Sequence, residues 1–125
     1  MDLKFLSWKE GKHFDLWIFV HFLSGTVGGS IVFFLGIPKL WSWILAFVFA
    51  IVWEILEWLF KVKEYKENKV IDVFTGMFGF AFSYEFIPLI VPNLGVYIYV
   101  ASIEVVLFLV LNIFGWKNYK RAQLS

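Results

Sequence analysis

Apolar residues in this chain form four long, nearly continuous runs, separated by short segments that contain charged residues or proline. A helix needs about 20 mostly apolar residues to cross the hydrocarbon core of a bilayer, and each run has about that length. The runs do not alternate with polar residues, which excludes a transmembrane β-barrel. The pattern predicts an all-α polytopic membrane protein, a bundle of four transmembrane helices spanning residues 14–35, 40–60, 70–91 and 94–115.

Proline and charged residues mark the borders of these spans. Gly36-Ile37-Pro38 and Pro92-Asn93 predict two tight turns, because proline disrupts a helix and favours a turn. Residues 61–69 carry too many charges for the hydrocarbon core. Residues 1–12 mix Leu, Phe and Trp with charged residues and predict a short N-terminal interfacial helix. We expect residues 1–125 to form one transmembrane domain.

The composition agrees with a lipid environment. Hydrophobic residues make up 61% of the chain and charged residues only 17%, whereas about 45–50% of an ordinary soluble domain is apolar. The absence of cysteine excludes disulfides, thiolate metal sites and iron–sulfur clusters. A net charge of +1 provides no basic field that would hold nucleic acid. The expected partner is therefore the lipid bilayer, with a homo-oligomer left open.

The distribution of Lys and Arg predicts the orientation. Ten of the 11 basic residues lie in residues 1–12, residues 61–69 and the C-terminal tail, which the four spans place on one side. Lys39 alone lies on the opposite side. By the positive-inside rule, both the N- and C-termini are cytoplasmic and the protein is integral to the cytoplasmic (inner) membrane.

Four ionisable residues fall inside the predicted spans, towards their cytoplasmic ends: His21, Glu54, Glu57 and Asp72. A charged side chain at the bilayer centre costs about 2.5–3.5 kcal/mol on insertion scales, so each needs a partner, a cavity or a task. Glu54 and Glu57 share one helix face because they are three residues apart. At a rise of 1.5 Å per residue, the depths of all four lie within roughly 10 Å of one another. The sequence predicts one polar site in the cytoplasmic leaflet.

The residue types in this site suit three kinds of chemistry. Carboxylates and an imidazole could bind a divalent cation, perform general acid–base catalysis or relay protons. We treat the four residues as candidate catalytic residues and as candidate ligands of a divalent cation, the metal being undetermined. Structural alternatives exist for two of them, since Glu57 could pair with Lys61 and Asp72 could cap the third helix.

Small residues share the helix faces of the site. Gly25 and Gly28 lie on the stripe of His21, and Gly76 and Gly79 on that of Asp72. Small residues let helices approach closely in membranes, so we expect these four glycines to form helix-packing surfaces.

Two further acidic residues, Glu85 and Glu104, lie elsewhere in the predicted spans. They support an alternative function, a small transporter or a proton or ion pathway in which they continue the polar route across the membrane. A structural or assembly subunit of a membrane complex is a third alternative.

Three motifs resemble those of a known family: HFLSG from His21, WEILEW from Trp53 and NKVIDVFTGMFGFAFS from Asn68. In this order they are similar to motifs of the VanZ-like and YjdF-type small integral membrane proteins. The resemblance implies a multi-span membrane protein whose family polar residues correspond to the four site residues, with Gly79 matching a family glycine. Trp17 stands where the family usually has an aspartate. The resemblance supplies no biochemical activity.

A polar site at this depth would meet both lipid headgroups and water. The leading hypothesis is therefore a protein that binds or processes a lipid-linked or amphiphilic substrate at the cytoplasmic leaflet, with a divalent cation as an option. Whether it is an enzyme stays open.

Overall fold

The computed structural model describes residues 17–59 and 66–124, where the chain forms helices and turns without a strand. The interfacial helix expected at residues 1–12 lies outside this range. Four of the helices are long and apolar enough to cross a membrane. In chain order the elements are α1 (Trp17–Leu35), α2 (Lys39–Leu59), α3 (Lys66–Ala81), the π-helical turn η2 (Phe82–Phe86), α4 (Ile87–Ile90) and α5 (Leu94–Leu124).

Two helices are longer than the apolar runs. Helix α3 begins at Lys66 rather than at residue 70, and α5 ends at Leu124 rather than at residue 115. Both extensions are rich in Lys, Glu, Gln, Arg and Ala, which have high helix propensity but no preference for lipid. Hydropathy marks only the apolar part of a helix, so the predicted spans begin after the start of α3 and end before the end of α5.

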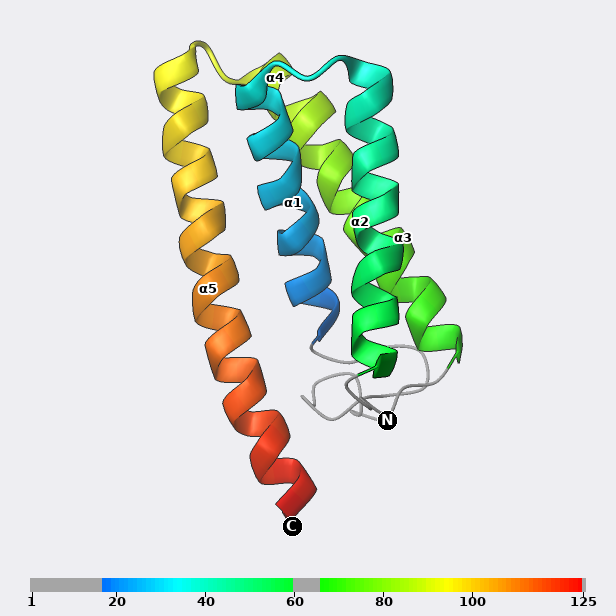
Figure 1. The fold of residues 1–125 in the computed structure, drawn as a ribbon. Helices are drawn as coiled ribbons and strands as arrows, with labels where there is room; N and C mark the ends of the chain where they lie inside the picture. The colour runs from blue at the N-terminus through cyan, green and yellow to red at the C-terminus, as the bar shows by residue number, and fades with distance from the viewer. Residues whose placement is uncertain (1–16, 60–65, 125) are drawn as a thin grey trace, which may run out of the picture.

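The four long helices run antiparallel to their chain neighbours, with α1 in the middle of the bundle (Figure 1). Helix α1 packs against α3 and α5, and α2 packs mainly against α3. We call the end where α2 finishes and α3 begins the α2–α3 end, and the opposite one the α1–α2 end. The turn at the α1–α2 end depends on Gly36, whose φ of 67° is the left-handed conformation that glycine adopts at helix C-termini.

Glycines allow α1 and α3 to pack backbone to backbone. A Cβ added at Gly25 would collide with the carbonyl oxygen of Gly76 and lie 2.8 Å from Phe80 N. One added at Gly79 would collide with the carbonyl of Phe22. A Cβ at Gly76 itself would meet only ordinary contacts, because this residue touches α1 through its carbonyl.

Gly28 differs from the expectation, since a Cβ there would have no atom within 4 Å. Its place on the packing face is taken by Gly29, where an added Cβ would lie 2.9 Å from Phe80 O. Successive residues on a helix point about 100° apart, so Gly25 and Gly29 face α3 while Gly28 faces elsewhere.

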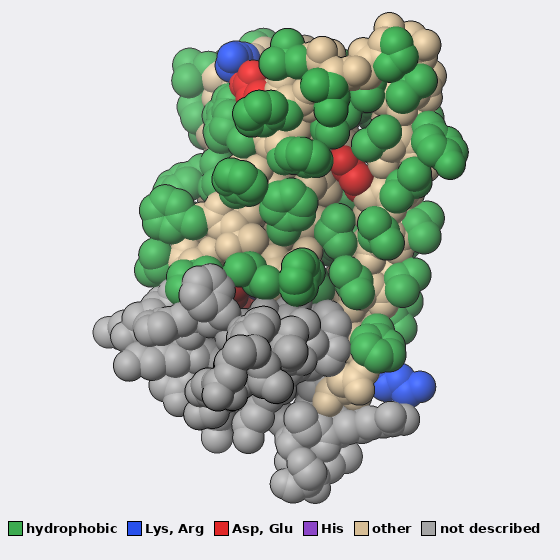
Figure 2. All heavy atoms as spheres, turned by 180° about the vertical axis from the view of Figure 1, so that it is seen from behind, with side chains coloured by type: hydrophobic (Ala, Val, Ile, Leu, Met, Phe, Trp, Pro, Cys, Tyr) green, Lys and Arg blue, Asp and Glu red, His purple; other side chains and the backbone are tan. Residues whose placement is uncertain are grey.

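The outer surface of the described helices is apolar over most of its extent. Figure 2 shows hydrophobic side chains spread over the described part of one face, with very few charged groups among them. In α2, Ser42 alone is fully buried, and large residues such as Phe49 and Trp58 are exposed. Such a surface is compatible with contact to lipid tails and is much larger than the apolar patches of soluble monomers.

Candidate functional site

The four ionisable residues expected at the site come together at the α2–α3 end. His21, Glu54, Glu57 and Asp72 each offer one ligand atom, and these atoms all lie within 4.8 Å of one another. His21 belongs to α1, the two glutamates to the end of α2 and Asp72 to the start of α3. We call these residues the His–Glu–Glu–Asp group.

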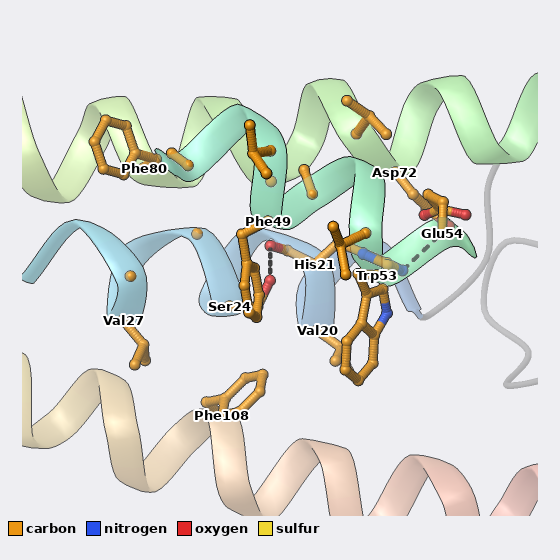
Figure 3. A pocket seen from close by; sticks show the side chains of 18 of the residues that line it. Val20, His21, Ser24, Val27, Phe49, Trp53, Glu54, Asp72, Phe80 and Phe108 are labelled. Carbon is orange, nitrogen blue, oxygen red and sulfur yellow. Dashed lines mark hydrogen bonds and ion pairs between the residues drawn. The ribbon is translucent and has the colours of Figure 1, made fainter. Parts of the chain in front are cut away.

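Asp72 and His21 form the buried side of the group. Asp72 is 2% exposed and His21 8%, and His21 Nε2 lies 3.1 Å from Asp72 Oδ2 (Figure 3). This contact involves Asp72 Oδ2, whereas Asp72 Oδ1 has no hydrogen-bond partner among the described residues. Asp72 does not cap α3, since the helix begins at Lys66 and Asp72 therefore lies beyond the first turn.

The two glutamates complete the group from α2. Glu57 Oε1 accepts a hydrogen bond of 2.9 Å from Trp53 Nε1, whereas Glu57 Oε2 is buried and has no hydrogen-bond partner among the described residues. Lys61, the alternative partner that helical spacing suggested, lies outside the described residues. Burying a carboxylate without compensation is costly, so three carboxylates so close together favour an additional positive charge.

A cavity of about 510 Å³ extends from this group along α1. The walls are mainly apolar side chains of α1, α2 and α5, and the group closes one end. Figure 3 shows Phe49 and Trp53 extending from α2, and Phe108 from α5, into the space beside α1. Gly28, with open space where its side chain would be, lines the same cavity. The site therefore joins a long apolar compartment to a compact polar end.

A second polar group lies nearer the α1–α2 end, and we call its four residues Ser30, Ser83, Tyr97 and Glu104 the Ser–Tyr–Glu cluster. Ser30 Oγ donates a 2.9 Å hydrogen bond to Glu104 Oε2 and lies 2.7 Å from Ser83 Oγ. Ser83 Oγ is itself 3.4 Å from Glu104 Oε2. All four residues are buried, with Glu104 only 7% exposed. The cluster ties α1, η2 and α5 together.

The π-helical turn explains the presence of Tyr97 in this cluster. The Ile87 N–H reaches back five residues to the Phe82 carbonyl, and in that register the next N–H would belong to Pro88, which has none. The Ser83 carbonyl therefore needs another donor. The Tyr97 hydroxyl donates to it at 3.1 Å from α5.

Glu85 and Glu104, the residues of the transport alternative, do not line the cavity. Glu104 belongs to the Ser–Tyr–Glu cluster. Glu85 Oε1 accepts a 3.1 Å hydrogen bond from Trp43 Nε1 and lies 3.2 Å from Lys39 Nζ, at the α1–α2 end. Neither residue extends the polar end of the cavity.

The sequence alone did not identify Ser30 and Tyr97 as partners of Glu104, nor the cavity walls. Signals for part of this exist, because Tyr97 and Glu104 are seven residues apart and therefore share one face of α5. Gly25 and Gly29 also form a GxxxG pair, which is typical of close helix packing.

Comparison of the chain with models of protein families, with curated proteins and with solved structures finds no match. The resemblance to the VanZ-like family therefore stays a prediction from the three motifs.

Proposed function

We propose that this chain is an integral membrane protein that binds an amphiphilic molecule, with the apolar tail in the cavity and the polar head at the His–Glu–Glu–Asp group. The observation that carries the proposal is the continuity of the two parts: the residues lining the cavity include all four members of the group. Binding sites for small molecules combine mostly apolar walls with a few convergent polar groups, and this cavity has that composition.

The location of the site fits a lipid-derived ligand. The group lies near the ends of α2 and α3, where a headgroup would lie at the border of the hydrocarbon, while the cavity runs alongside the apolar part of α1. The basic residues near this end favour the cytoplasmic side for it under the positive-inside rule. An enzyme that modifies a lipid-linked substrate and a protein that only binds one would both use this arrangement, and the VanZ-like motifs contain the same four residues.

Photo-crosslinking tests ligand binding directly. The purified protein, reconstituted in phosphatidylcholine liposomes, is irradiated with a single-chain alkyl probe that carries a diazirine in its tail, and the labelled peptides are mapped by mass spectrometry. We expect labels on half-buried cavity residues, Val27 and Phe108 among them. Labels spread evenly over lipid-facing positions would contradict the proposal.

Gly28→Leu provides the matched variant. The new side chain would fill the cavity without meeting a neighbouring atom at Cβ, and leucine has a higher helix propensity than glycine by about 1 kcal/mol. We expect folding to be retained and cavity labelling to be lost. Val106→Leu, at an exposed position outside the cavity, is the control and should label like the wild type. Unchanged cavity labelling in Gly28→Leu would overturn the proposal.

The orientation is tested in the same cysteine-free background. Single cysteines at Lys66 and Gln123 should react with a membrane-impermeant maleimide only from the cytoplasmic side. A cysteine at Lys39 should react only from the opposite side. Labelling of positions 66 and 39 from the same side would rule out the four-span arrangement.

A further inference from the structure

The spacing of the His–Glu–Glu–Asp group matches that of ligands around one metal ion. Imidazole nitrogens and carboxylate oxygens bind Zn²⁺ at about 2.0–2.2 Å in a tetrahedral arrangement, so two ligand atoms of one such ion lie about 3.3–3.6 Å apart. The four ligand atoms of the group lie within 4.8 Å of one another. Small side-chain rotations would close the difference. His21 Nε2 and Asp72 Oδ2, at 3.1 Å, already have about the separation of two adjacent ligands.

A second, independent observation also favours a cation at this group. Asp72 is 2% exposed, and its Oδ1 has no hydrogen-bond partner among the described residues. Glu57 Oε2 is also a buried oxygen without a hydrogen-bond partner among the described residues. Buried carboxylate oxygens are normally paired with cations or hydrogen-bond donors, and the described residues supply neither to these two oxygens, which favours a cation at this group.

The charge and the donor types distinguish between possible cations. Three carboxylates and one imidazole carry up to three negative charges, of which a divalent ion offsets two and an alkylammonium head only one. Mg²⁺ and Ca²⁺ prefer oxygen ligands alone, whereas imidazole together with carboxylates suits Mn²⁺, Fe²⁺ and Zn²⁺. The donor set therefore favours a divalent transition metal.

We propose that the His–Glu–Glu–Asp group binds one divalent transition-metal ion and that this ion receives the ligand's headgroup through an oxygen donor such as phosphate. The four side chains come from α1, α2 and α3, and all four residues also line the cavity, so an ion held by them would adjoin the compartment proposed for the tail. The choice of headgroup rests on the proposed function, whereas the metal site stands without it.

Mn²⁺ binding tests the metal site by itself. Protein purified in detergent and stripped with a chelator is titrated with Mn²⁺, and free Mn²⁺ is measured by electron paramagnetic resonance. We expect one Mn²⁺ per chain, displaced by Zn²⁺ and not by equimolar Mg²⁺. Asp72→Asn and Glu57→Gln should each weaken binding at least about tenfold, the low end of the effect of losing even an outer-shell partner.

Glu85→Gln is the matched control, because Glu85 also accepts a tryptophan N–H but lies at the other end of the bundle. Its Mn²⁺ affinity should equal that of the wild type. Circular dichroism of each variant establishes that it is folded. No bound Mn²⁺ in the folded wild type, or equal weakening by Glu85→Gln, would overturn the metal site.

The headgroup is tested by competition with the diazirine probe. Dodecyl phosphate should reduce cavity labelling when Mn²⁺ is present and not when it is absent, whereas dodecylamine should have little effect in either condition. Competition by dodecylamine without metal would overturn the oxygen-donor headgroup. If Mn²⁺ binds but neither amphiphile competes and the cavity is not labelled, the metal site stands and the proposed function fails.

Discussion

Glu57 and Glu104 are both carboxylates in an apolar helical bundle, yet their surroundings differ. Glu104 Oε2 accepts a hydrogen bond from Ser30 Oγ at 2.9 Å, has Ser83 Oγ at 3.4 Å, and does not border the cavity. Glu57 shares its end of the cavity with two other carboxylates, and one of its oxygens has no hydrogen-bond partner among the described residues. At 1.5 Å per residue, the two groups are about 14 Å apart along α1, from His21 to Ser30.

The difference separates a structural polar group from a candidate functional one. Buried polar side chains that satisfy one another fix how helices pack, and the Ser–Tyr–Glu cluster does this for α1, η2 and α5. Glu57 Oε2 and Asp72 Oδ1, by contrast, are buried without a hydrogen-bond partner among the described residues, and both residues line the cavity, which makes their group a candidate for binding a ligand. The same residue type therefore occurs in two different environments, and the hydrogen-bond partners are what distinguish them.

The largest loss of stability is expected at the Ser–Tyr–Glu cluster. Ser30→Ala removes the hydroxyl that donates to Glu104 and leaves only the longer contact from Ser83. Leaving a buried acceptor underpaired should lower the free energy of unfolding by about 1–3 kcal/mol, measured by denaturant titration in micelles. Ser102→Ala, at an exposed site on α5, is the control and should have a small effect. Mn²⁺ affinity should not change, and a parallel loss of it would remove the distinction between the two groups.

The second prediction concerns coupling inside the His–Glu–Glu–Asp group. Glu54→Gln and His21→Gln should each abolish probe or Mn²⁺ binding, and the double variant should be little worse than either, because the residues act as a unit. The double variant should also be as stable as either single variant, with a coupling free energy of about 1 kcal/mol. Thermal unfolding in detergent, with and without Mn²⁺, measures both effects. Purely additive losses would mean that the two residues do not share a site.

The bundle itself could be predicted from the sequence, because hydropathy and proline act locally. Four apolar runs and the segments around Pro38 and Pro92 indicate helices and turns without knowledge of their neighbours. The helix ends at Lys66 and Leu124 lie beyond the predicted spans because they depend on helix propensity outside the apolar part. The proximity of the four residues of the His–Glu–Glu–Asp group could be predicted for a related reason, because the depth of a residue along a helix follows from counting residues.

The direction in which each side chain points could not be predicted from counting alone. Gly28 and Gly29 are neighbours in sequence, but Gly28 faces the cavity and Gly29 faces α3. The partners of Glu104 come from segments 74 and 21 residues away, and no local pattern connects them. The cavity depends on how the four long helices are rotated about their axes, which only packing determines.

The third prediction tests the account of Pro88 and Tyr97. Tyr97→Phe leaves the Ser83 carbonyl without the donor that compensates for the missing N–H of Pro88, and should cost about 1 kcal/mol of unfolding free energy. In a Pro88→Ala background the helix regains an N–H, so the same substitution should cost clearly less. Equal costs in the two backgrounds, measured by denaturant titration, would show that Tyr97 stabilises the bundle in some other way.

The smallest effect on stability is expected for Glu57→Gln. Whether this variant is more or less stable than the wild type tests the contrast between the two polar groups. Glutamine keeps an oxygen that can accept the Trp53 N–H, and it removes one of three crowded negative charges. Without a cation we therefore expect the free energy of unfolding to stay the same or rise by about 0.5 kcal/mol, within the range of a single like-charge contact.

Glu85→Gln is the same chemical change at a carboxylate that also accepts a tryptophan N–H, but there the lost charge faces Lys39 at 3.2 Å. This variant should be slightly less stable, by up to about 1 kcal/mol, because it loses a partly exposed ion pair. Adding Mn²⁺ should reverse the ranking, since bound metal stabilises the folded state of every protein that retains the site and Glu57→Gln binds it weakly. If Glu57→Gln were the less stable variant in metal-free buffer, its carboxylate would already be compensated within the fold, and the group would be a structural one like the Ser–Tyr–Glu cluster.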